Sequence, residues 1–103
     1  MQPIEPSGRD HPERLTVRVP EHVVYRDFAE QTVALNLQTG RYHGLNETAA
    51  TMLDALREGP TVAAAAERLA REWNVSPEVL LADLLELCEG LESRGLLETH
   101  VTE

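Results

Sequence analysis

Apolar and polar residues alternate between Thr32 and Leu37, which is the pattern of a β-strand with two unlike faces. The larger apolar side chains share one face, and the smaller or polar ones share the other. The first face holds Val33, Leu35 and Leu37, and the second holds Ala34 and Asn36. We therefore predict a strand over residues 32–37.

Two neighbouring segments extend this strand into a sheet. Residues 22–28 are rich in Val, Tyr and Phe, which favours a strand. A turn at 38–40, with Gly40 suited to a positive φ, leads into a returning strand over 41–45. The segments predict an antiparallel meander of three strands. The alternating residues 15–19, just before Pro20, are compatible with a short fourth strand at its front.

The second half of the chain repeats apolar residues at helical spacing. The predicted helices cover 47–58, 62–73 and 77–94. Each follows a residue that favours a helix start, namely Asn46, Thr61 and Ser76. We therefore expect an α+β fold of the winged helix-turn-helix type, in which a three-stranded antiparallel sheet is followed by three helices.

The third predicted helix carries two apolar stripes. The first consists of Leu80, Leu84, Leu87 and Leu91. The second lies about 100° further round the helix and consists of Leu81, Leu85 and Cys88. Either the sheet and the other helices cover both stripes, or the second stripe forms the floor of an exposed groove beside the last strand. An exposed apolar groove usually marks a binding surface.

The last strand has a feature of its own, because Gly44 interrupts it. A glycine inside a strand marks either a bend or the close approach of another backbone. If this strand lies at the edge of the sheet, its unpaired N–H and C=O groups invite an added strand. This segment and the third helix together indicate peptide recognition.

Charge narrows the range of partners. The chain has 18 acidic and nine basic residues, for a formal charge of −9. Such a surface repels nucleic acid and attracts basic peptides or basic patches on proteins. The third helix, which would read DNA in a winged-helix regulator, carries carboxylates where such a helix needs Arg, Lys, Asn or Gln. Those carboxylates belong to Glu78, Asp83, Glu86, Glu89 and Glu92.

Length and composition indicate one domain over residues 15–98 of the 103, with a disordered N-terminal tail at 1–14 and a C-terminal tail at 99–103. A single cysteine excludes an internal disulfide, and no apolar run is long enough for a secretion signal or a membrane span. We expect a soluble cytoplasmic protein without contact to a membrane.

No motif for catalysis, a metal or a cofactor is found. The four histidines are dispersed, the single cysteine provides no zinc spacing, and no phosphate-binding or dinucleotide fingerprint occurs. Cys88 lies in a leucine-rich helix, where a buried thiol is the expected state and a nucleophile is the alternative. We expect neither an enzyme nor a metal or cofactor site.

Five sequence features together resemble a known family. They are TGRYHGLNETAATMLDAL, the Pro-Thr start of an alanine-rich helix, Trp73-Asn-Val, Leu81-Ala-Asp-Leu-Leu and Arg94-Gly-Leu-Leu-Glu. In this order and spacing they resemble the PqqD-like peptide chaperones over about residues 18–98. These proteins are the recognition elements for ribosomally made, post-translationally modified peptides (RiPPs). The Gly-Arg-Tyr step is most similar to the stand-alone leader-binding proteins of lasso-peptide biosynthesis.

This resemblance implies that the leader of a precursor peptide binds as an added strand against the third strand, in a groove toward the third helix. The implied peptide-binding residues are Arg41, Tyr42, His43, Gly44 and Leu45 in the strand, and Leu81, Leu85 and Cys88 in the groove, with Leu84 at its border. Asp83 matches an acidic position of the family and would meet a basic leader residue. At His43 the family often has an aromatic residue, so stacking there is not expected.

The resemblance also implies partners. A cysteine protease would remove the leader, and a cyclase would then close the ring. Two alternatives remain: the same fold serving quinone-cofactor maturation with a radical enzyme, and a winged-helix transcriptional regulator.

Overall fold

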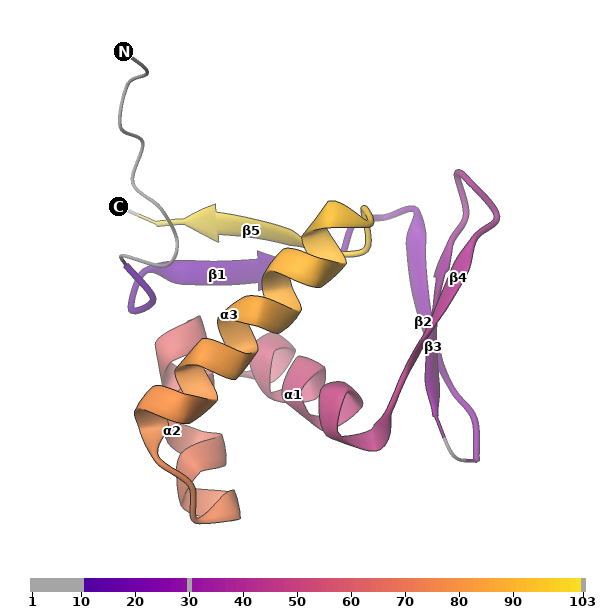
Figure 1. Cartoon of the computed structure of the whole chain (residues 1–103). Helices are drawn as coiled ribbons and strands as arrows, with labels where there is room; N and C mark the ends of the chain where they lie inside the picture. Colours follow the sequence, from indigo (N-terminus) through magenta and orange to yellow (C-terminus); the bar gives the residue numbers. More distant parts are fainter. Residues whose placement is uncertain (1–10, 30, 103) are drawn as a thin grey trace.

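The computed structural model describes residues 11–29 and 31–102. It has a three-stranded sheet, three helices and a separate two-stranded ribbon (Figure 1). The elements are β1 (Leu15–Arg18), β2 (Val23–Asp27), β3 (Thr32–Asn36), β4 (Tyr42–Leu45), α1 (Glu47–Glu58), α2 (Val62–Trp73), α3 (Pro77–Ser93) and β5 (Glu98–Val101). The expected antiparallel meander followed by three helices is confirmed.

The meander has the strand order β2-β3-β4, so β4 lies at an edge. Gly40, in the turn between β3 and β4, has a φ of 74°, as the tight turn requires. Figure 1 shows this sheet standing to one side of the helices, with the chain passing directly from β4 into α1. Within the described residues, no other strand pairs with the outer edge of β4.

The alternation within β3 is confirmed, and the structure shows which face is covered. Thr32, Ala34 and Asn36 are buried, and Ala34 is completely so. Val33 and Leu35 are only half-buried, and Leu37 just after the strand is 58% exposed. The small side chains pack toward the body, and the larger apolar ones form the outer face of the sheet.

The helix starts follow the capping residues with one exception. The side chains of Asn46 and Thr61 accept hydrogen bonds from backbone amides three residues later, at 2.8 and 3.1 Å. Ser76 does not cap α3, because its hydroxyl donates to a carboxylate oxygen of Glu78 at 2.7 Å. The helix pair α2–α3 then completes the helix-turn-helix part of the fold.

The expected tails require a correction. Residues 98–101 form β5, which pairs with β1 from Leu15↔Val101 to Arg18↔Glu98. Residues 11–14 form a turn, in which the carbonyl oxygen of Pro12 accepts a hydrogen bond from Ala63 at 3.1 Å. The pairing joins opposite ends of the chain, so no local pattern announces it. The rest of the expected N-terminal tail, residues 1–10, lies outside the described residues.

Candidate functional site

A groove between β4 and α3 consists of two adjoining hollows that share Arg94. The apolar hollow, of about 490 Å³, has a floor of apolar side chains from β4, α1 and α3 and two carboxylates at its rim. Its floor includes Leu45, Met52, Leu87 and Leu91, and its rim carries Asp83 and Glu86. The arginine hollow, of about 630 Å³, is lined by Asn36, Thr39, Arg41, His43, Ser93 and Arg94.

The backbone of β4 presents a free edge at this groove. The amide of Asn36 donates to the carbonyl oxygen of Arg41 at 2.9 Å, and the pairing continues through Ala34↔His43. Bonded and non-bonded pairs alternate in an antiparallel ladder. Therefore Tyr42 and Gly44 direct their N–H and C=O groups away from β3, where no other described strand pairs with them.

The side chains of this segment divide between two faces. Arg41, His43 and Leu45 point toward the body and line the groove. Arg41 is exposed, His43 is half-buried and Leu45 is buried. Tyr42 lies on the outer face and is 71% exposed. Gly44 shares that face, and a Cβ added to it would lie 3.1 Å from the side-chain oxygen of Gln31.

Helix α3 presents a different stripe to the groove than we expected. Leu84, Leu85 and Cys88 are buried in the core, with 0%, 9% and 2% of their surfaces exposed. Leu81 lies on the side of α2, in a shallow pocket with Ala63. The expectation that Leu81, Leu85 and Cys88 line the groove, with Leu84 at its border, is therefore wrong, because this side of α3 packs against α2 and the core.

On the α3 side, the groove is lined by several residues that were not expected there, among them Leu87, Gly90 and, just past the end of the helix, Arg94. Leu87 belongs to the first apolar stripe and shares the helical spacing of the buried Leu80 and Leu84, so hydrophobic periodicity did not separate it from core leucines, although it is only partly buried. Asp83, which was selected, lies at the rim as an exposed carboxylate. Arg94 had a detectable signal, since it is the basic residue at the end of an otherwise acidic helix.

Cys88 is not suited to act as a nucleophile. Burial, with a smaller contribution from the carboxylates of Glu92 and Glu89, raises the pKa of its thiol to about 12. The thiol is therefore protonated near neutral pH, whereas nucleophilic attack requires the thiolate.

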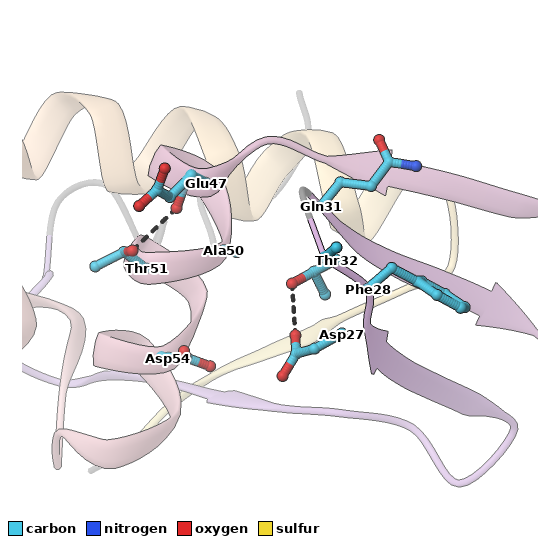
Figure 2. Close-up of a pocket in the computed structure, with 9 residues that line it drawn as sticks. Asp27, Phe28, Gln31, Thr32, Glu47, Ala50, Thr51 and Asp54 are labelled. Carbon is cyan, nitrogen blue, oxygen red and sulfur yellow. Dashed lines mark hydrogen bonds between the residues drawn. The ribbon is translucent and has the colours of Figure 1, made fainter.

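A further pocket lies between the β2–β3 turn and α1 (Figure 2). It has carboxylates from both sides, with Asp27 on the sheet and Glu47 and Asp54 on α1. Asp27 is already engaged, since it accepts a 2.6 Å hydrogen bond from the Thr32 hydroxyl. Within residues 11–29 and 31–102, no group of His, Cys, Asp and Glu side chains is arranged to hold a metal ion. In the same ranges, no helix has the length and apolar character needed to span a bilayer.

Comparisons with known proteins agree with this geometry. Among solved structures, a lasso peptide synthetase B1 in complex with a leader peptide is 26% identical, with a TM-score of 0.74, over 80% of this chain and 96% of that one. TbiB1 in complex with the TbiA(beta) leader peptide is 27% identical, with a TM-score of 0.71, over 79% and 94%.

The PqqD part of Methylobacterium extorquens PqqCD, described as a stand-alone RiPP recognition element, is 26% identical, with a TM-score of 0.70, over 89% of this chain and 93% of that one. No curated protein matches the chain. The family model of Coenzyme PQQ synthesis protein D (PqqD) matches residues 31–97, well over half of the sequence. With the strand edge, the groove and the fold in agreement, the chain belongs to the PqqD family.

Proposed function

We propose that this protein binds the leader segment of a ribosomally made precursor peptide, which adds to the sheet as a strand beside β4. The observation that carries the proposal is the free backbone edge at Tyr42 and Gly44, directly beside the groove. Strand addition obtains affinity from backbone hydrogen bonds and specificity from pockets for alternate side chains. The apolar hollow and the arginine hollow are such pockets.

The energies are sufficient for specific binding. A backbone hydrogen bond contributes about 1 kcal/mol net. A buried apolar anchor, such as one seated on Leu87 and Leu91, contributes roughly 1.5–3 kcal/mol. After the costs of association and of ordering the peptide, a few of each correspond to a dissociation constant near 1 μM.

The similar structures support this function, because two of them were solved with leader peptides bound. We propose that the strand segment from Arg41 to Leu45 contacts the leader, and that Leu87 and Leu91 take the groove role expected of the second stripe. Asp83, at the rim, would face a basic residue of the leader.

We further propose that the protein is a non-catalytic adaptor of lasso-peptide biosynthesis in the cytoplasm, where precursor peptides are made. It would present the bound leader to a cysteine protease that removes it, before a cyclase closes the ring. The outer face of the sheet, with Leu35, Leu37 and Tyr42, adjoins the edge of β4 and is a suitable surface for the protease.

Within the same family, the alternative is that the protein acts in quinone-cofactor maturation together with a radical enzyme. It has less support, because the structure with the highest TM-score of the three described above is a lasso peptide synthetase B1, whereas the PqqD part of PqqCD has a TM-score of 0.70. A transcriptional regulator is disfavoured by the exposed carboxylates Asp83, Glu86 and Glu89 on α3.

Titration of the purified protein with the synthetic leader of the precursor encoded beside it tests the proposal. We expect a dissociation constant in the micromolar range or below. Hydrogen exchange should show new protection of the amides of Tyr42 and Gly44 in the complex. Absence of binding, or binding without protection at β4, would contradict the proposal.

A further inference from the structure

The arginine hollow is a local concentration of positive charge on a strongly acidic protein. The formal charge of the chain is −9, and all nine of its basic residues are arginines. Two of them, Arg41 and Arg94, line this hollow together with His43, and none of its lining residues is a carboxylate. They come from separate parts of the chain, because Arg41 directly precedes β4 and Arg94 directly follows α3.

Among the described residues, several other arginines already have an acidic or aromatic partner, whereas Arg41 and Arg94 do not. Arg68 pairs with Glu58 at 2.8 Å, Arg18 lies 3.9 Å from Glu98, and Arg57 lies over the ring of Tyr25. By contrast, no salt bridge joins Arg41 or Arg94 to a carboxylate within the ranges 11–29 and 31–102. An arginine side chain binds a carboxylate through two parallel hydrogen bonds, so two arginines in one hollow make a good receptor for that group.

Strand geometry brings a bound peptide past this hollow. Arg41, His43 and Leu45 alternate along β4 on the face toward the groove. An added strand also alternates, so every second side chain faces the same groove. The four steps along the strand from Leu45 to Arg41 correspond to about 13 Å of extended chain. This length is close to the helical rise of about 12 Å from Glu86 to Arg94, just past the end of α3.

We propose that Arg41 and Arg94 bind a carboxylate side chain of the leader, located two or four residues from the apolar side chain that fills the apolar hollow. This inference rests on the proposed function and adds the chemistry of one subsite to it. The spacing is even because both side chains must lie on the same face of the added strand.

The opposite charge at the other end of the groove gives this subsite a second role. Asp83 and Glu86 lie at the rim of the apolar hollow, away from Arg41. A leader bound in the reversed direction would place its carboxylate beside these acidic residues. Like charges in contact oppose such binding, so the charge pattern selects one strand direction and register.

Fluorescence anisotropy with two peptides tests the inference. The first is the labelled synthetic leader of the precursor encoded beside this protein, and the second is the same peptide with every Asp and Glu replaced by Asn and Gln. The variants are Arg41→Gln, Arg94→Gln and their combination. Arg71→Gln is the matched control, because Arg71 is exposed in the last turn of α2 and does not line the groove.

We expect each single variant to weaken binding of the natural leader about three- to tenfold and the combination to weaken it further. The amide peptide should bind wild type and variants alike, and Arg71→Gln should match wild type. Equal affinity of wild type and the double variant for the natural leader would overturn this inference while leaving the proposed function intact. Failure of the wild type to bind the natural leader would overturn both.

Discussion

The phenol hydroxyl of Tyr25 donates a 2.7 Å hydrogen bond to the carbonyl oxygen of Leu96, and this bond ties the three-stranded sheet to the segment that follows α3. Tyr25 lies on β2 and Leu96 lies just past the end of α3, so the bond joins the two sides of the groove. The guanidinium of Arg57 lies 5.9 Å from the centre of the same ring. We infer that Tyr25 holds the groove at its working width.

Removal of the hydroxyl should therefore affect both stability and binding. Tyr25→Phe deletes one hydrogen bond, which lowers the free energy of unfolding by about 1 kcal/mol. It also loosens the contact between sheet and helix, so leader affinity should fall by a small factor. Urea unfolding and a leader titration measure the two effects. Unchanged stability would show that the bond does not join the two parts as described.

Tyr25 also makes stability depend on pH. Burial, partly offset by Arg57, raises the pKa of Tyr25 to about 12, above the value of about 10 in the unfolded chain. Its contribution to stability is therefore complete below pH 10 and is lost as the pH rises toward 12. Urea unfolding at pH 8 and pH 11 should show a smaller loss for Tyr25→Phe than for wild type. Cys88 titrates in the same direction in both proteins, so the difference between them isolates Tyr25.

The free edge of β4 is tested by a substitution that removes one N–H group. Gly44→Pro deletes an outward-facing donor, so the leader should lose a backbone hydrogen bond and bind about tenfold less tightly. Gly44→Ala is the matched control, because it retains the donor and its Cβ meets the end of the exposed, flexible Gln31 side chain. If the proline variant is folded by circular dichroism and binds as tightly as the alanine variant, the leader does not pair at Gly44.

The same substitution at two leucines of α3 should affect leader binding in one case and folding stability in the other. Leu87→Asp places a charge in the apolar hollow, where the side chain is only half-buried, so the fold should persist while leader binding falls at least tenfold. Leu85→Asp places a charge in the core and should cost about 3 kcal/mol of stability or more. Circular dichroism and leader titration of both variants separate these outcomes. Normal leader binding by a folded Leu87→Asp variant would exclude the apolar hollow as the site.

The Cys88 thiol should resist alkylation in the native protein. Its raised pKa keeps it protonated at pH 8, and its side chain is 2% exposed. Iodoacetamide should modify it slowly in buffer and quickly in urea, as followed by mass spectrometry. Cys88→Ala should lower stability by about 1 kcal/mol through a small cavity and leave leader affinity unchanged. Rapid alkylation in buffer would show that this face of α3 is open.

Much of the fold was predictable because its signals are local. The helix starts at Asn46 and Thr61 follow from side-chain capping, and the turn at Gly40 follows from a positive φ. These interactions connect residues only a few positions apart. The order of the three meander strands and the three helices, with the groove segment at Arg41–Leu45, was therefore accessible from the sequence alone.

Only the tertiary structure shows which apolar surfaces are buried against other elements. Periodicity identified two apolar stripes on α3, but it does not reveal that Leu85 and Cys88 pack into the core while Leu87 lies in the groove. Likewise, the pairing of β1 with β5 joins segments 80 or more residues apart. Each stripe has the same hydrophobic character, and only the position of α2 and the sheet around α3 determines which one remains open. The sequence by itself determined the meander, the helices and their apolar faces, because these depend on local patterns. Three-dimensional packing decided the pairing of β1 with β5 and which face of α3 forms the site.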